Sequence, residues 1–257
     1  MIDAFSAVKI ERLLAETFVE RVEHHATLSS TNDRARAAAD ETGPLPLLVV
    51  ADEQTAGRGR RGHKWWTGPG SLAMSLLFDP AQLAIPGEFR LRISLATAVA
   101  VVDTLQPLAP DEDLGLHWPN DVFANGRKLG GILIEGLSDG RMIVGIGVNA
   151  NNSLEEAPPE VQRTAVSLLE LTGEPHNPTN LVAALLNRLE ARLRQLSQSP
   201  RTLGRRFNQL CLQRGHQLAI RQGKTTISGR CEGIAEDGAL LLSTPKGKRK
   251  FYSGTLS

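Results

Sequence analysis

The stretch GRGRRGHKWW, residues 57–66, decides how this chain is arranged around a ligand. It interleaves Arg58, Arg60 and Arg61 with three glycines and ends in two tryptophans. Glycine lets a backbone take positive φ and approach a ligand closely, and each guanidinium is a permanent planar charge suited to phosphate or carboxylate. This Arg/Gly loop therefore indicates a site that closes over an anion attached to a flat ring, and a nucleotide is such a molecule.

Residues 57–62 also match the G-x-G-x-x-G pattern of dinucleotide-binding proteins. That pattern needs a helix directly after its third glycine, but HKWWTGPG follows here, with two more glycines and a proline. A Rossmann domain is therefore disfavoured. A P-loop enzyme is disfavoured too, because the sequence contains no GxxxxGK[ST] motif. An RNA-binding Arg/Gly tail is also disfavoured, because this segment is single and internal.

The composition is that of an ordinary globular protein. The chain has 257 residues with 41% hydrophobic content, enough for one large domain and one small one. Lys+Arg is 29 against Asp+Glu 28, so no overall basic field attracts nucleic acid. We expect a cytoplasmic protein, because there is no secretory signal and the apolar run 45–51 is too short to span a bilayer. Cys211 and Cys231 lack CxxC spacing and are expected to be buried free thiols.

The apolar pattern predicts helices and strands as far as residue 212, followed by short strands only. Residues 1–28 read as an extended or partly helical lead-in. Helices are predicted over 30–43, 87–105, 165–173, 181–196 and 202–213, and strands over 45–52, 71–78, 114–121, 127–137 and 141–151. From Gly215 the strands alternate with Gly-containing turns, which is typical of a small antiparallel barrel. We therefore predict two domains, 1–212 and 213–257.

The segment HWPNDVFANGRKLGGILIE, residues 117–135, carries a second group of chemical side chains. Asn120 and Asp121 follow a predicted strand, where Asp121 could supply a hard oxygen ligand to Mg²⁺; an ordinary Asn-Asp turn is the alternative. Lys128 lies before an apolar strand, where its ammonium could reach a phosphate. A solvated hairpin lysine is the alternative.

The segment SSTND, residues 29–33, has two interpretations as well. Helix capping accounts for Ser30 or Thr31 fully. Gln54 follows a buried strand, and its amide could orient a polar ligand or pair with backbone. If Trp65 and Trp66 lie on a strand they face opposite ways, so that one is in the core and one lies against a ligand.

Taken together, these segments resemble the biotin–protein ligases. That family shows a Ser-Thr-Asn motif, a glutamine before GRGRxGRxW, then KWPNDxxxxxxKxxGIL and a G-x-G-x-N strand. Here the matching stretches are SSTN at 29–32, Gln54, GRGRRGHKW at 57–65, HWPNDVFANGRKLGGIL at 117–133 and GIGVN at 145–149. The resemblance implies an α/β (α+β type) fold, in which a mixed sheet is flanked by helices as in class II aminoacyl-tRNA synthetases, with a small C-terminal SH3-like barrel.

The resemblance also implies an activity. Biotin and Mg-ATP would give biotinyl-5′-AMP and pyrophosphate, and a lysine of a biotin carboxyl carrier domain would then attack the acyl-adenylate. Mg²⁺ is the implied cofactor, with Asp121 as its candidate ligand. Only some 28 residues precede the SSTN motif, so we expect no sequence-specific DNA binding. No membrane partner is expected, and both a monomer and a homodimer remain open.

The residues that match the family motifs divide into three groups. Catalytic charge would come from Lys128, Arg58 and Arg60. The biotin side would be lined by Ser30, Thr31, Asn32, Gln54, Gly57, Arg58, Gly59, Arg60 and Lys128. The ATP side would be lined by Arg58, Arg60, Arg61, Trp65, His117, Asn120, Asp121, Lys128 and Asn149.

Two histidines depart from the family pattern. His117 stands where lysine usually precedes WPN, and His63 where a loop arginine is usual, so each replaces a fixed cation by a group that titrates near neutrality. Three other readings remain: a lipoate–protein ligase or octanoyl transferase, whose Arg-Arg-x-Ser-Gly-Gly-Gly run this chain lacks; a non-catalytic nucleotide or biotin sensor; and an α/β protein whose motifs are all turns and caps.

Overall fold

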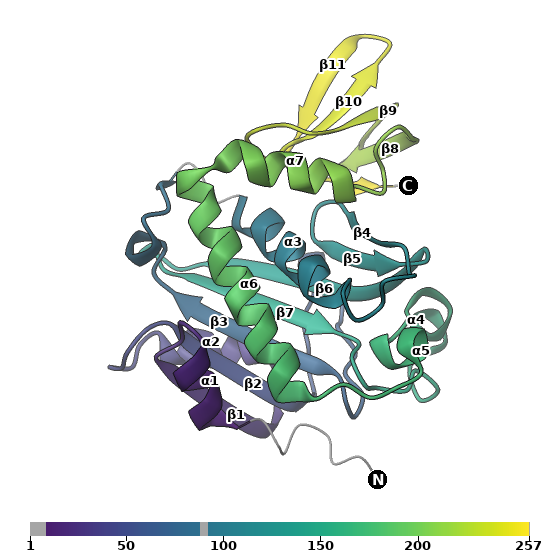
Figure 1. Ribbon diagram of the computed structural model, residues 1–257. Helices are drawn as coiled ribbons and strands as arrows, with labels where there is room; N and C mark the ends of the chain where they lie inside the picture. The colour runs from purple at the N-terminus through teal and green to yellow at the C-terminus, as the bar shows by residue number, and fades with distance from the viewer. Residues whose placement is uncertain (1–8, 88–91, 257) are drawn as a thin grey trace.

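The computed structural model describes residues 9–87 and 92–256 and contains two β-sheets (Figure 1). The larger sheet has seven strands in the order β1-β2-β3-β7-β6-β5-β4. β1 and β2 run parallel and the other neighbours run antiparallel, so the sheet is mixed, as expected. Its strands are β1 (Arg21–Leu28), β2 (Leu47–Gln54), β3 (Leu72–Phe78), β4 (Leu114–His117), β5 (Asp121–Ala124), β6 (Arg127–Gly136) and β7 (Met142–Val148).

Helices cover both faces of this sheet. The described α-helices are α1 (Ile10–Glu16), α2 (Thr31–Ala38), α3 (Ile93–Leu105), α4 (Pro159–Thr164), α5 (Leu168–Thr172), α6 (Pro178–Gln198) and α7 (Pro200–Leu210). On the face of α3 and α6, Leu48 and Val50 of β2 join the main core. On the face of α2, Leu47 and Val49 pack with Ala35. Because successive strand residues point to opposite faces, the unbroken apolar run of β2 fills both cores.

Several element boundaries differ from those predicted. The helix predicted over 30–43 ends at Ala38, because the next three N–H groups bond three residues back and tighten the chain into a turn. The strand predicted over 114–121 is divided into β4 and β5 by a turn. The lead-in contains α1 and β1, and α4 was not predicted. Residues 1–8 and 88–91, which fall in the predicted lead-in and in the predicted helix 87–105, lie outside the described residues.

The C-terminal part forms a separate antiparallel sheet, as the strand spacing predicts. Its order is β11-β10-β9-β8-β12. The strands are β8 (Gln217–Gln222), β9 (Thr225–Ile234), β10 (Leu240–Thr244), β11 (Gly247–Phe251) and β12 (Thr255–Leu256). Cys211 and Cys231 are buried and free, as expected. The domain boundary between residues 212 and 213 stays a prediction.

Within the described residues, every helix is too short or too polar to cross a membrane.

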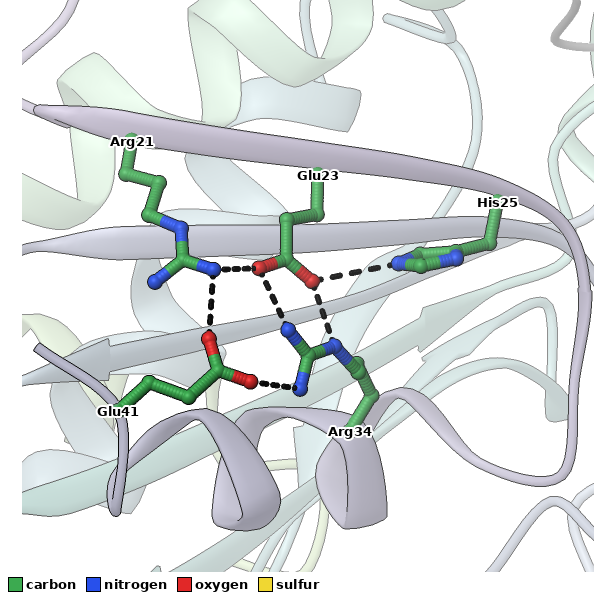
Figure 2. Close-up of polar contacts among 5 residues, drawn as sticks. All are labelled: Arg21, Glu23, His25, Arg34 and Glu41. Carbon is green, nitrogen blue, oxygen red and sulfur yellow. Dashed lines mark hydrogen bonds and ion pairs between the residues drawn. The ribbon is translucent and has the colours of Figure 1, made fainter. Parts of the chain in front are cut away.

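An ion cluster fixes α2 on the outer strand β1 (Figure 2). Arg34 of α2 donates to both oxygens of Glu23 at 2.7 and 2.9 Å and to Glu41 at 2.7 Å. Arg21 contacts both carboxylates, at 2.8 Å in the case of Glu41, and the His25 ring lies 3.3 Å from Glu23. The cluster thus joins residues of β1 to Arg34 of α2 and to Glu41, which lies just after that helix. The cluster holds the helix whose first turn carries the Ser-Thr-Asn motif.

Replacing Arg34 by methionine should lower the free energy of unfolding by about 1–2 kcal/mol at pH 7, because Glu23 and Glu41 lose their shared partner. Urea denaturation measures this. Arg194→Met is the matched control, since it removes an exposed i,i+4 pair with Glu190 and should change little. Equal losses in the two variants would contradict the account of the cluster.

The difference in unfolding free energy between wild type and Arg34→Met should also depend on pH. Hydrogen bonds from Arg34 and then Arg21 lower the pKa of Glu41 from 4.5 to about 2. The stability linked to Glu41 is therefore complete above its unfolded pKa and is lost as the pH falls through its folded pKa. Acid titration of the unfolding free energy should show this difference narrowing between pH 4.5 and about 2.

Candidate active site

A row of small residues across the larger sheet forms the floor of a pocket. Ala73 of β3 pairs with Gly147 of β7, which pairs with Gly131 of β6, which pairs with Asp121 of β5. A Cβ at Gly147 would overlap the indole of Trp65. A pocket of about 250 Å³ lies beside this indole, with Gly147, Gly131 and Asp121 of the row in its lining. The pocket is lined by the predicted residues Ser30, Thr31, Asn32, Gln54, Arg58, Gly59, Arg60, Arg61, Trp65, His117, Asn120, Asp121 and Lys128.

A chain of hydrogen bonds forms one wall of the pocket. The Thr31 backbone N–H and hydroxyl donate to Gln54 Oε1 at 2.8 and 3.1 Å. Ser75 Oγ lies 2.8 Å from Thr31 Oγ1 and 2.6 Å from Asn32 Oδ1. Asn32 Nδ2 donates to Glu135 at 2.7 Å. Four elements thus share one network, which fixes each member in a single orientation.

The capping hypothesis for the SSTND segment is right in position only. Ser30 occupies the N-cap position of α2, but its side chain accepts no capping hydrogen bond from the described residues. The Thr31 hydroxyl is used by Gln54 instead. Both residues are buried beside the pocket, at 2% and 4% exposure. The motif therefore serves the pocket rather than the end of the helix.

The Arg/Gly loop is a closed hairpin. Gly59 N–H donates to His63 O at 2.7 Å, and Trp65 N–H donates to Gly57 O at 2.9 Å. Arg61, at its tip, has φ of 57°, in the left-handed region that a non-glycine residue rarely takes. The backbone therefore presents all three arginines from a short, defined turn. No helix follows Gly62 directly, as the argument against a Rossmann domain requires.

Arg58 lies between two carboxylates at the rim of the pocket. Its Nη2 is 2.5 Å from Asp33 Oδ1 and 3.3 Å from Glu135 Oε2. Glu135 also holds Asn32. One carboxylate therefore touches both the polar wall and the cation of the loop.

The other two arginines of the loop contact different elements. Arg60 Nη1 donates to Asn120 Oδ1 at 3.0 Å, in the turn between β4 and β5. Arg61 contacts the hydroxyl of Thr255 in β12. The loop is thus tied to the larger sheet and to the C-terminal sheet at once.

Lys128 of β6 is the second cation at the pocket. Its Nζ lies 2.8 Å from Asp121 Oδ1 and 5.6 Å from the centroid of the Trp65 ring. The side chain is 32% exposed. A half-buried ammonium held by one carboxylate and one aromatic face can still be reached by an incoming anion. The solvated-hairpin alternative for Lys128 therefore does not describe its surroundings.

His117 is less basic than its sequence position suggests. Its ring stacks on Phe123 with centroids 5.1 Å apart. Burial lowers the pKa of His117 below 6.5; Asp121 acts in the opposite direction and Lys128 in the same one. At neutral pH the residue is therefore an uncharged ring, where the family pattern has a fixed cation.

The two tryptophans of the loop have separate environments. Trp65 lines the pocket above Gly147, and its Nε1 is buried without a partner among the described residues. Trp66 packs away from the pocket with Leu154 and Val161. Of the two indoles, Trp65 is therefore the one placed to meet a ligand.

Two predicted residues do not line the pocket. Gly57 is buried under the hairpin, where a Cβ would lie 3.0 Å from Gln54 Nε2. Asn149 is 3% exposed, and its Nδ2 lies 3.4 Å from the Lys128 carbonyl and 3.3 Å from the Val166 carbonyl. In this structure both residues contact backbone atoms next to the pocket: Gly57 packs closely against the Trp65 carbonyl, and Asn149 donates to backbone carbonyls.

Asp121 is the predicted metal ligand. Across residues 9–87 and 92–256, no group of three or more His, Cys, Asp or Glu side chains could hold a metal ion. Its carboxylate is paired with Lys128. A cation bound here would need most of its oxygen ligands from elsewhere, as Mg²⁺ does when it arrives with phosphates.

Sequence reasoning missed several residues of the site. Ser75 is the single polar residue of the apolar strand β3, and Glu135 follows the apolar run Ile132–Ile134 of β6; these interruptions are the signal that could have found them. Gly254 to Leu256 at the C-terminus line the pocket too. Their sequence gives no sign of it, because β12 reaches the pocket only through the arrangement of the two sheets.

Comparisons with known proteins agree with this geometry. Residues 26–151 match the biotin/lipoate A/B protein ligase family, and residues 217–257 match the biotin protein ligase C terminal domain. The chain is 32% identical to the bifunctional ligase/repressor BirA of Bacillus subtilis, over 95% of this chain and 76% of that protein. It is 32% identical to the biotin--[acetyl-CoA-carboxylase] ligase of Mycobacterium tuberculosis, over 81% of this chain and 76% of that protein. The solved structure of the biotin protein ligase from Aquifex aeolicus in complex with biotin and ATP superposes with a TM-score of 0.80 at 29% identity, over 93% of this chain and 98% of that one.

The pKa of His117 should report its charged neighbours. Asp121→Asn should lower it further, since the carboxylate favours the imidazolium, and Lys128→Gln should raise it, since the ammonium disfavours the same form. NMR titration of the His117 Cε1 proton measures both shifts. A wild-type pKa at or above 6.5, or shifts of the opposite sign, would contradict the burial and charge assignment.

Proposed function

Because this chain belongs to the biotin/lipoate A/B protein ligase family, and within it to the biotin–protein ligases, we propose that it is an ATP-dependent ligase for biotin. It activates biotin as biotinyl-5′-AMP and transfers the biotinyl group to a lysine of a biotin carboxyl carrier domain. The observation that carries this proposal is the pair of cations, Arg58 and Lys128, held at the rim of one pocket beside a hydrogen-bonded polar wall.

The first step joins two acids. An oxygen of the biotin carboxylate attacks the α-phosphorus of ATP, a new O–P bond forms, and the bond from that phosphorus to the pyrophosphate oxygen breaks. Both reactants are anions, so positive charge must already be in place where they meet. Lys128 and Arg58 supply it, and Arg60 adds a third charge from the same loop.

The second step releases AMP. The uncharged amine of the acceptor lysine attacks the acyl carbon, an amide bond forms, and the bond from that carbon to the phosphate oxygen breaks, with the amine giving up a proton. No side-chain nucleophile of this chain is needed, because the acyl group stays on AMP until transfer. The hairpin of the Arg/Gly loop would keep water from the mixed anhydride.

The two ends of the pocket suit the two substrates. We assign Ser30, Thr31, Asn32 and Gln54 to the biotin side, because their side chains are uncharged and can form hydrogen bonds. The ATP side is assigned to Trp65, His117, Asn120 and Asp121, together with Lys128, next to the cations. Mg²⁺ would arrive with the ATP phosphates, and Asp121 is its candidate protein ligand.

The remaining proposals concern partners and location. We propose a cytoplasmic enzyme whose macromolecular partner is the carrier domain. The near-neutral formal charge of +1 supports the absence of sequence-specific DNA binding. A homodimer is left as an alternative to a monomer.

The direct test is transfer to a carrier fragment. The protein is incubated with biotin, Mg-ATP and a biotin carboxyl carrier fragment, and intact mass should show one biotin adduct on a lysine. Lipoate in place of biotin should give no adduct. The double variant Arg58→Ala/Lys128→Ala should lose activity; full turnover by that variant, or transfer of lipoate alone, would refute the proposal.

The glycines of β7 predict that the KM values for the two substrates can be changed separately. A Cβ at Gly145 would overlap Asn32 Oδ1, whereas one at Gly147 would overlap Trp65. Gly145→Ala should therefore raise the KM for biotin, and Gly147→Ala the KM for ATP, each by roughly tenfold or more. Steady-state kinetics with each substrate varied in turn measures this.

Gly204→Ala is the control for the two glycine variants. Gly204 lies in α7 with open space around the position of a Cβ. This variant should leave both KM values unchanged. An exchange of the two effects, or the same change in both glycine variants, would contradict the assignment of the two ends of the pocket.

A further inference from the structure

We propose that Gln213, at the junction of the two sheets, is a positioning residue for the ATP side of the site. The proposal rests on the proposed function. Gln213 touches none of the reacting groups that the pocket would hold. It acts through the turn at residues 118–120, which joins β4 to β5 and carries Asn120 to its pocket position.

Gln213 supplies the turn with a backbone hydrogen bond from outside it. Its side-chain Oε1 accepts the Trp118 N–H at 3.1 Å. Both residues are buried, at 4% and 2% exposure. The next residue is Pro119, which has no N–H, so the Trp118 N–H is the only backbone donor in the first two positions of the turn, and Gln213 fixes it there.

The segment that carries Gln213 runs beside β4. Cys211 forms a parallel bridge with Leu116, and Leu212 N–H donates to the Leu116 carbonyl at 3.1 Å. Figure 1 shows the end of α7 beside β4 and the C-terminal sheet. This segment therefore extends the edge of the larger sheet, and Gln213 is its last contact before the chain enters the C-terminal sheet.

The turn is held from two sides. Toward the middle of the larger sheet, Asn120 Nδ2 donates to the Ile132 carbonyl at 2.7 Å, and Ile132 N–H donates to the Asn120 carbonyl at 2.9 Å. Toward the edge of the sheet, Gln213 holds Trp118. Asn120 Oδ1 can then accept from Arg60. Without Gln213, one of the two supports of that contact is lost.

The same turn leads into Asp121, the partner of Lys128. A displaced turn would therefore disturb both cation contacts on the ATP side. The biotin wall is carried by α2, β2, β3 and β6, and its hydrogen bonds described above involve neither Gln213 nor Trp118. Loss of Gln213 should weaken ATP binding while leaving biotin binding intact.

The side-chain amide of Gln213 also has fewer hydrogen bonds than expected for a residue with a purely stabilising role. Its Nε2 is buried and has no partner in the described part of the chain. An apolar residue of the same length would remove that orphan donor while also removing the acceptor for Trp118, and these two effects on stability oppose each other. The kinetic effect is therefore separable from the effect on folding.

The test replaces Gln213 by methionine, which has the same unbranched length; Gln213→Leu is the second variant if the first does not fold. The KM for ATP should rise about tenfold or somewhat less, as expected for one lost hydrogen bond, and the KM for biotin should stay within about twofold of wild type. Hydrogen exchange at the Trp118 amide should become faster.

Asn208→Leu is the matched control. Asn208 is an amide at the same junction, where it accepts from Ile234 N–H at 2.7 Å and donates to the Ile234 carbonyl at 3.0 Å. It ties α7 to β9 without touching the turn, so its loss should leave the KM for ATP and the exchange of Trp118 unchanged.

An unchanged KM for ATP in the Gln213 variant, an equal rise in Asn208→Leu, or unchanged exchange at Trp118 would each overturn the proposal. The exchange measurement does not depend on activity. If the wild-type protein transfers no biotin, the proposed function is refuted. If hydrogen exchange at the Trp118 amide is unaltered in the variant, only the positioning role of Gln213 is refuted.

Discussion

The arrangement depends on how positive charge is held beside a half-buried pocket. Arg58 lies on Asp33 and Glu135, and Lys128 lies on Asp121. Lys128 is 32% exposed, and leaving its ammonium without a partner there would cost free energy. Protein carboxylates therefore stabilise each cation before any substrate enters. An incoming phosphate or carboxylate of the substrate then takes the place of the protein carboxylate beside each cation. The site therefore neutralises its substrates without first having to remove water from a free cation.

The remaining structure places those ion pairs. The absence of side chains at Gly147 and Gly131 leaves room on the sheet for the indole of Trp65, whose ring centroid lies 5.6 Å from Lys128 Nζ. A valine at either position would fill this space and push the indole away. On the other side of the pocket, the ion cluster around Arg34 fixes α2, whose first turn supplies the polar wall. The loop joins these parts because its arginines contact different elements.

The apolar pattern of the sequence was enough to predict most of the helices and strands and the C-terminal antiparallel unit. The resemblance to the biotin–protein ligases implied the mixed sheet and a set of site residues, of which all but Gly57 and Asn149 line the pocket. Local patterns failed where long-range contacts decide the outcome. Ser30 reads as a cap, yet the tertiary structure uses its neighbour Thr31 in a network with Ser75. His117 reads as a near-neutral titrating group, but burial lowers its pKa. Thr255 is more than a hundred residues away from the loop arginine that it contacts, and no local pattern encodes that distance.

A crystal structure with biotinyl-5′-AMP bound would test the exchange of ion pairs most directly. The account predicts that Arg58 leaves Asp33 and that its guanidinium lies within hydrogen-bond distance of the ligand phosphate. Lys128 Nζ should turn from Asp121 to the bond between the carboxyl and phosphoryl groups. If both cations kept their protein partners while the ligand was bound, or if the guanidinium pointed into bulk water, the central claim would be wrong.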